Sequence, residues 1–171
     1  MAKRVSLREY QHGLVARLRA VADAPAAPVS MLGLQIGHDN WLVELSDAGE
    51  VLPLPNFVSV PLTRSWYCGV ANVRGNLYSI ADLAAFIGET PTHPTVDSRV
   101  LLVGQKFGVN CGILVSRMLG LRKPEQLTRK EQTSIDRPWI KAQYLDDDGA
   151  LWTELAMREL IQHPDFLQVG I

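Results

Sequence analysis

The sequence predicts a mainly β fold. From about residue 30 onward, short apolar runs alternate with turn residues every 8 to 12 positions or so, a pattern typical of barrels and sandwiches. Groups of Asp, Asn and Gly separate several runs, as in GHDN at 37–40 and DDDG at 146–149. The 171 residues, 47% of them apolar and 20% charged, suffice for one domain or two small subdomains.

An amphipathic helix is expected ahead of this β region. Ser6 and Glu9 have the spacing of a capping box. Apolar side chains then recur at spacings of three and four, at Leu7, Tyr10, Leu14, Leu18 and Val21. The stripe either packs on its own domain or offers a surface to a partner, including a second copy of the chain.

A change of composition marks the start of the main domain. The segment DAPAAPVS at 23–30 contains two prolines and reads as a linker. We therefore divide the chain into a helix and linker at 1–29, a main domain at 30–165 and a tail at 166–171.

Eight strands are expected in the main domain, each an apolar run between turn residues. Their ranges are 31–37, 41–46, 50–54, 76–83, 99–105, 109–116, 140–146 and 150–156. Besides the two turns above, GQKFG at 104–108 suits a hairpin. We expect the strands to pair antiparallel.

One supersecondary pattern occurs twice. Gly75 is followed by NLYSIADL and AAFIG, and Gly149 is followed by ALWTEL and AMRELI. Each copy contains an apolar strand, an acid before leucine and a short helical piece, so Asp82 and Glu154 fill equivalent places. The repeat suggests two related small barrels.

Charge and hydropathy exclude several classes of protein. The net charge of -1 gives no field to hold a polyanion, which disfavours nucleic acid as a partner. No run approaches the roughly 18 to 20 apolar residues that span a bilayer, and the amino end does not resemble a secretory signal. We expect a cytosolic protein in which Cys68 and Cys111 serve only as small buried side chains.

No motif for catalysis, metal or nucleotide binding stands out. The four histidines are scattered, none with a second ligand at metal-binding spacing, and no phosphate-binding or dinucleotide-binding glycine motif occurs. We expect no metal and no cofactor, and a binding module in preference to an enzyme. A hydrolase triad dispersed along the chain would leave no such signature and stays open as an alternative.

The stretch GVANVRGNLYSIADL at 69–83 resembles the G-V-x-N-x-R-G-x-x-x-x-x-x-D-L signature of the CheW family of chemotaxis coupling proteins. The likeness continues through the segments 32–55, 99–121 and 144–161. Within the family the chain looks most like the PilI branch, adaptors of the array that controls type IV pili and twitching motility. Four departures from the family pattern are Gly49, Ser116, Met118 and Glu154.

The resemblance implies a fold and a function. The fold would be CheW-like, with two small five-stranded SH3-like β-barrel subdomains, short helices and the extra amino-terminal helix. The function would be that of a non-catalytic adaptor between a methyl-accepting chemoreceptor and a histidine kinase. Its partners would be the regulatory domain of a CheA-like kinase and the cytoplasmic tip of the receptor, with the protein in the cytoplasm beside membrane-bound arrays and not inserted in the membrane.

The candidate partner-binding residues lie in two segments. We expect the guanidinium of Arg74 to pair with Glu50 near the receptor-binding surface, because its planar fork suits carboxylates. Asn72 should bond local backbone, and Gly69 and Gly75 should allow tight turns at the two ends of the motif. The remaining candidates are apolar interface anchors: Val43, Leu45, Val51, Leu52 and Val70.

Two alternatives of other classes remain. Short strands and exposed aromatic residues such as Trp66, Tyr67 and Tyr78 also suit a barrel that binds single-stranded nucleic acid. The second is the small hydrolase with a dispersed triad. Arg74 could also serve only to bridge strands.

Overall fold

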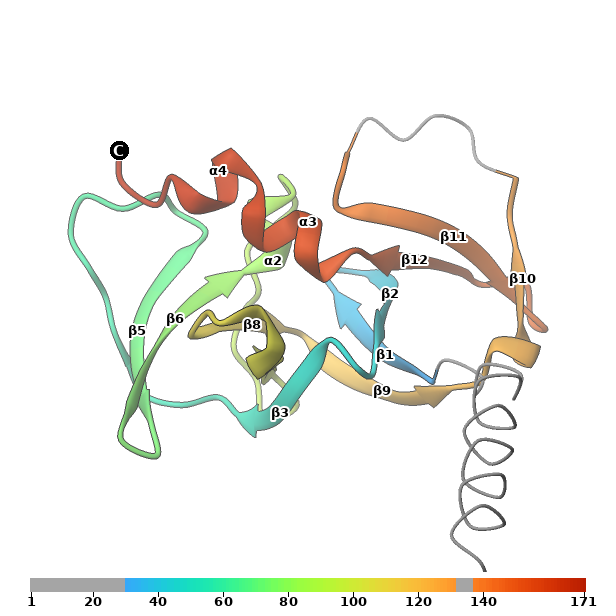
Figure 1. The fold of residues 1–171 in the computed structure, drawn as a ribbon, viewed down its shortest axis with the longest axis horizontal. Coiled ribbons are helices and arrows are strands. Elements are labelled where there is room, and N and C mark those ends of the chain that lie inside the picture. The colour runs from blue at the N-terminus through green and yellow to red at the C-terminus, as the bar shows by residue number, and fades with distance from the viewer. Residues whose placement is uncertain (1–29, 132–136) are drawn as a thin grey trace, which may run out of the picture.

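The computed structural model describes residues 30–131 and 137–171, and two β-sheets of six strands each dominate it (Figure 1). The mainly β fold is therefore confirmed. The amino-terminal helix and linker expected at 1–29 lie outside the described residues. Within the described part, no helix is long and apolar enough to cross a bilayer.

One sheet is built from a single stretch of chain, and we call it the continuous sheet. Its order is β3-β7-β8-β6-β5-β4. The strands are β3 (Ala48–Pro53), β4 (Phe57–Val58), β5 (Tyr67–Val73), β6 (Asn76–Asp82), β7 (Arg99–Val103) and β8 (Cys111–Val115). A short helix, α2 (Leu83–Phe86), follows β6.

The other sheet takes its strands from both sides of that stretch, and we call it the split sheet. Its order is β10-β11-β12-β2-β1-β9. The strands are β1 (Met31–Ile36), β2 (Asp39–Glu44), β9 (Arg117–Arg122), β10 (Leu127–Arg129), β11 (Ile140–Asp146) and β12 (Leu151–Leu155). Each sheet has six strands where five were expected, and each ends in a very short edge strand, β4 or β10.

All eight expected strands are present, and the three expected turns join antiparallel neighbours. Gly37, Gly108 and Gly149 have positive φ angles of 59°, 67° and 79° in these turns, a conformation that glycine adopts at little cost. Four strands were not expected: β4, β5, β9 and β10.

The expectation of purely antiparallel pairing is wrong at one place in each sheet. β6 pairs with β8 in parallel, and β12 pairs with β2 in parallel. These strands occupy equivalent positions in the two sheets. In both cases intervening strands bring the chain back in its starting direction, so parallel neighbours arise without a simple βαβ unit.

The repeat around Asp82 and Glu154 has a structural counterpart. β6 and β12 hold the same place in their sheets. Each is the second strand of an antiparallel hairpin, and each leads into a helix. The side chains of Asp82 and Glu154 are both almost fully buried. The carboxylate of Asp82 accepts hydrogen bonds from the backbone N–H groups of Ala84 (3.1 Å) and Thr92 (2.7 Å) and from the Thr92 hydroxyl (2.9 Å).

Apolar side chains form three clusters. The largest lies between the sheets and includes residues of α2, α3 (Met157–Gln162) and α4 (Pro164–Leu167). A smaller cluster belongs to each sheet alone, around Ile80 in the continuous sheet and around Trp152 in the split sheet. Figure 1 shows α3 and α4 running from the split sheet toward the continuous sheet, so the central cluster joins the two units.

Residues 166–171 contact the main domain at two places. Phe166 is buried in the central cluster, and its ring stacks on that of Trp66 with centroids 5.4 Å apart. Gly170 forms a β-bridge with Thr63. The last six residues therefore contact the main domain, and the boundary expected at residue 165 stays a prediction.

Candidate protein-binding surface

The turn between β5 and β6 displays Arg74 in an uncommon conformation. Arg74 and Gly75 are the two residues between the strands, and their φ angles are 52° and 87°. Positive φ at both positions characterises the type I′ hairpin turn, which usually takes Asn or Gly. The backbone N–H of Gly75 donates to the Asn72 side chain (2.8 Å), as expected for Asn72.

Arg74 reaches the strand at the opposite edge of the same sheet. Its Nη2 atom lies 2.6 Å from Oε1 of Glu50 on β3, so the expected pair exists. The Arg74 side chain is 76% exposed and that of Glu50 40%. Exposed pairs of this kind contribute only about 0.2–1 kcal/mol to stability. The fold does not depend on this pair, and its charged groups are accessible to a partner.

Gly69 does not form a turn. It lies within β5 at a break in the β5–β6 register, with a φ of 134°. A Cβ atom at this position would lie 2.1 Å from the carbonyl oxygen of Val58. The expectation of a tight turn is therefore corrected: Gly69 is required because the β4 backbone passes directly over it.

The structure separates the apolar candidates. Val43 is wholly buried in the central cluster and cannot contact a partner, so that expectation is corrected. Leu45 and Val51 are exposed, whereas Leu52 and Val70 are half-buried. Val43 is buried because both faces of the split sheet are covered at β2. Three consecutive residues of that strand are therefore buried, and the usual alternation of buried and exposed residues fails there.

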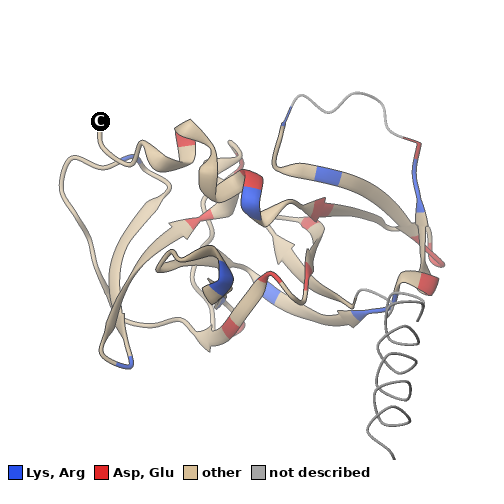
Figure 2. Cartoon of the chain, in the orientation of Figure 1, with Lys and Arg blue, Asp and Glu red and all other residues tan. Residues whose placement is uncertain are grey.

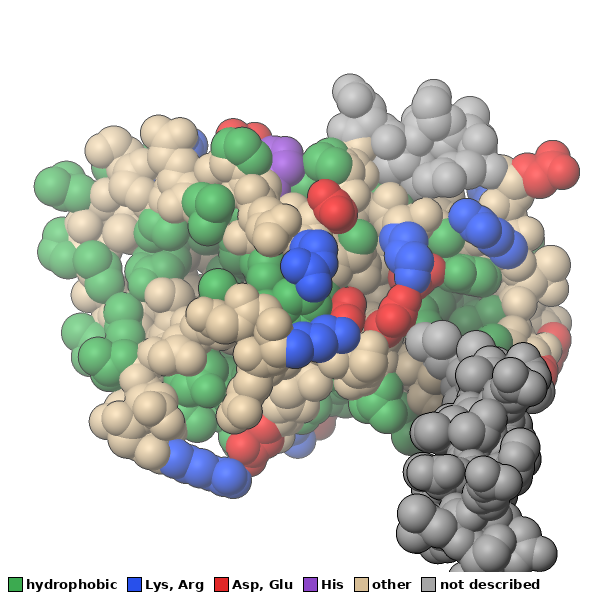
Figure 3. Space-filling view, in the orientation of Figure 1, with side chains coloured by type: hydrophobic (Ala, Val, Ile, Leu, Met, Phe, Trp, Pro, Cys, Tyr) green, Lys and Arg blue, Asp and Glu red, His purple; other side chains and the backbone are tan. Residues whose placement is uncertain are grey.

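Sequence reasoning missed a group of exposed apolar residues near β4 and the last residues of the chain. Val58 on β4, Leu62 in the loop that follows and Ile171 are 75%, 76% and 82% exposed, and Val60 is exposed with them. We call these four residues the apolar rim. Figure 3 shows apolar side chains gathered at the end of the molecule that carries this loop and the last residues. The run FVSVPL, apolar but interrupted by Pro61, was the available signal.

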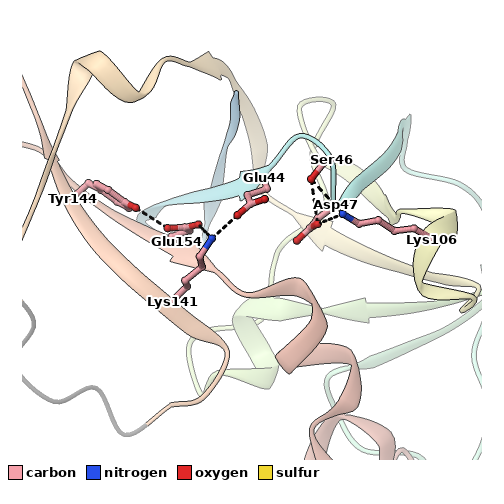
Figure 4. A network of polar contacts seen from close by, with 7 residues as sticks. All are labelled: Glu44, Ser46, Asp47, Lys106, Lys141, Tyr144 and Glu154. Carbon is pink, nitrogen blue, oxygen red and sulfur yellow. Dashed lines mark hydrogen bonds and ion pairs between the residues drawn. The ribbon is translucent and has the colours of Figure 1, made fainter. Parts of the chain in front are cut away.

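A network of charges lies beside the junction of the two sheets (Figure 4). Lys141 on β11 contacts both Glu44 and the buried Glu154, the latter at 2.8 Å, and Tyr144 donates to Glu154 (2.8 Å). Burial opposes the charge of Lys141, but hydrogen bonds to Glu154 and Glu44 outweigh it and raise the lysine pKa. These charges satisfy one another and serve the packing of the split sheet.

Tyr144 gives the network a measurable pH dependence. Burial, followed by the hydrogen bond to Glu154, raises the pKa of Tyr144 from 10.0 to about 12. Its contribution to stability is therefore complete below pH 10 and is lost as the pH rises through 12. In urea titrations between pH 10 and 12, the free energy of unfolding should fall less steeply for Tyr144→Phe than for the native chain. Equal slopes would contradict this prediction.

The two cysteines are not activated thiols. Burial, followed by the charge of Asp82, raises the pKa of Cys68 to about 11, and burial raises that of Cys111 to about 12. Both thiols are therefore protonated at neutral pH, whereas a nucleophile or metal ligand needs the thiolate.

A cavity of about 540 Å³ lies between the β1–β2 turn and the segment after α2. Its lining includes His38, Asp39, Glu89, His93 and Ser116. Burial, followed by the charge of Asp39, raises the pKa of Glu89. Among the described residues, no hydrogen bond joins Ser116 to a histidine or a histidine to either acid, and no group of three His, Cys, Asp or Glu could hold a metal. The cavity lacks the contacts of a catalytic triad.

Charge distribution does not favour nucleic acid. Figure 2 shows acidic and basic positions interspersed over both sheets, without a basic stripe in this view. A single-stranded nucleic-acid groove combines such a stripe with exposed aromatic rings. Trp66 is instead buried in the central cluster, and Tyr67 and Tyr78 are half-buried.

The fold and the exposed hairpin define a small two-sheet scaffold domain. Residues 30–165 match the family model described as CheW-like domain. Since this match covers most of the chain, the chain belongs to the CheW-like family, whose members are non-catalytic scaffolds.

Relatives agree with this assignment. The chain is 30% identical over 146 residues to "Protein PilI" of Pseudomonas aeruginosa, covering 83% of this chain and 80% of the relative. It is 29% identical over 85 residues to "Probable chemotaxis protein CheW" of Rhizobium etli, covering 50% and 54%. The crystal structure of scaffolding protein TtCheW from Thermoanaerobacter tengcongensis superposes with a TM-score of 0.67 at 19% identity, over 81% of this chain and 96% of that one. The last comparison shows the fold.

Proposed function

We propose that this chain couples a methyl-accepting chemoreceptor to a CheA-like histidine kinase in an array that controls type IV pili. The similarity to PilI supports the pilus output, and the family supports the adaptor role. The observation that carries the proposal is the exposed Arg74–Glu50 pair on a strained hairpin turn. A permanent cation held there at a conformational cost, with little gain in stability, suits a binding function.

The two proposed surfaces both lie along β5: the Arg74 turn follows its last residue, and the apolar rim begins at Val58, which pairs with Val70. The receptor tip binds at the Arg74 turn, with Glu50 and Val51 beside it. The regulatory domain of the kinase binds at the apolar rim, because exposed apolar residues on a short edge strand are typical interface anchors. Separate surfaces allow both partners to bind at once (Figure 1).

The mechanism is thermodynamic linkage between receptor state and kinase state, with no catalytic step. If the domain fixes receptor and kinase in register, a change in receptor state alters the free energy difference between kinase states. Couplings of this kind typically amount to about 1–3 kcal/mol. The protein would lie in the cytoplasm beside the membrane-bound receptors. Self-association through the stripe at residues 7–21 stays a prediction, as does the division of the chain at residues 30 and 165.

Binding measurements test the proposal. The full chain should bind the kinase regulatory domain and a receptor fragment from the same organism, each in calorimetry, and all three should co-elute as one complex. Addition of the chain should make the kinase respond to receptor state. A pull-down from native cytosol that recovers neither protein, or the discovery of turnover in a broad esterase screen, would contradict it.

A further inference from the structure

The loop at residues 59–66, which carries Val60 and Leu62 of the apolar rim, holds one residue in a conformation that is uncommon for leucine. Leu62 has a φ of 58°, in the left-handed region. For a residue with a Cβ atom this conformation is costly, and the exposed Leu62 side chain gains no burial that would offset the cost. Within the loop, the Thr63 hydroxyl donates to the carbonyl of Val60 (2.8 Å) and closes the turn. Contacts from outside the loop add to this support.

These contacts come from residues 168–171, which we call the strap. The backbone N–H of Ile171 donates to the carbonyl of Leu62 (3.1 Å), and the N–H of Arg64 donates to the carbonyl of Val169 (2.8 Å). The Nε–H of Arg64 donates to the carbonyl of Gln168 (2.9 Å). The backbone of the strap therefore bonds to the residues before and after Thr63, as an antiparallel β-strand would.

The strap is held by these hydrogen bonds and by the half-buried side chain of Val169, which packs against the central cluster. A cavity of about 180 Å³ opens beside it, lined by Trp66, Cys111 and Phe166 among others, together with Leu167 and Val169 of the terminal segment. Packing under the strap is therefore incomplete, although Phe166 anchors the preceding helix on Trp66. Loss of the strap should free the loop without dismantling the central core, because local opening takes place where buried apolar contacts are few.

We propose that residues 168–171 position the rim loop, and that kinase binding depends on this strap. The role in kinase binding rests on the proposed function. The role of the strap in positioning the loop does not. With the strap in place, Leu62 and Ile171 present their side chains side by side on neighbouring backbones as one preformed surface. Without it, the loop must be ordered at the moment of binding, which lowers the affinity.

Three variants of the full chain test the structural part. One chain stops at Leu167, a second carries Ile171→Pro, which removes the N–H that bonds Leu62, and a third carries Ile171→Ala, which keeps that N–H. We expect exchange of the Arg64 amide hydrogen to accelerate at least tenfold in the first two variants, and trypsin to cleave after Arg64. Exchange and cleavage at Arg64 should stay as in the native chain for Ile171→Ala, which keeps the N–H group and loses only an exposed side chain. Native protection of Arg64 in the shortened chain would overturn the proposal.

The binding part has its own readout. The shortened chain and Ile171→Pro should bind the kinase regulatory domain at least tenfold more weakly, while affinity for the receptor fragment at the Arg74 turn stays the same. Undiminished kinase affinity in a chain whose loop has become mobile would overturn the role in binding. If the native chain binds no kinase, the proposed function fails, yet amide exchange and proteolysis still decide whether the strap holds the loop.

Discussion

Arg74→Glu is expected to abolish receptor control of the kinase while the protein remains folded. The substitution places two carboxylates, residue 74 and Glu50, where the structure has an ion pair of 2.6 Å. It also removes the only basic side chain at the β5–β6 turn. Because both side chains are exposed, the free energy of unfolding should change by no more than about 1 kcal/mol. The affinity for the receptor fragment, measured by calorimetry, should fall at least a hundredfold.

Two matched controls separate charge from conformation. Arg74→Asn removes the cation but suits the positive φ of the turn, so it should preserve or slightly raise stability and still lose binding. Arg117→Glu reverses an exposed arginine on β9, far from the turn in sequence, and should bind normally. If Arg74→Glu restores receptor-dependent kinase output, the role assigned to Arg74 is wrong and the residue only bridges β3 to the hairpin.

Asp82→Ala should produce the largest loss of stability. The buried carboxylate accepts bonds from three backbone N–H groups and the Thr92 hydroxyl, and it joins the start of α2 to the segment before β7. Removing it leaves these donors unpaired inside the protein, which should cost about 3 kcal/mol. The urea midpoint would then fall by about 1–2 M, given an m-value of about 1.5–3 kcal/mol/M.

Asp97→Ala supplies the control for this experiment. Asp97 is an exposed acid of the same segment, and its side chain accepts no hydrogen bond in the described residues. Its replacement should change the free energy of unfolding by less than about 0.5 kcal/mol. Equal midpoints for the two variants would show that the Asp82 bonds contribute little.

Local sequence signals predicted local structure well. The eight strands with clear apolar runs and the three turns with Gly, Asp or Asn were all found, because each depends on neighbouring residues. β5 was missed because CGVANV contains Gly69 and small side chains, and β9 because glycine and terminal arginines interrupt its apolar run. The parallel pairs depend on contacts between distant strands, for which the sequence carries no local mark.

In the candidate site, too, local features were predicted and features that depend on distant parts of the chain were not. The family resemblance led to Arg74, Glu50 and Asn72. The Arg74–Glu50 pair and the bond from Gly75 to Asn72 are both present. Burial of Val43 and exposure of Leu62 could not be foreseen, because both depend on which face of the chain the rest of the protein covers. The strap joins residues about a hundred positions apart through backbone atoms, which leave no trace in side-chain pattern.

The split sheet has a consequence for synthesis on the ribosome. The β1–β2 hairpin emerges first, but its neighbours β9 and β12 are translated after the whole continuous sheet. Nascent chains ending near residue 115 would carry a complete continuous sheet and a hairpin with two unpaired edges, a state open to aggregation. Chaperones should therefore bind this early hairpin until the last third of the polypeptide has left the exit tunnel.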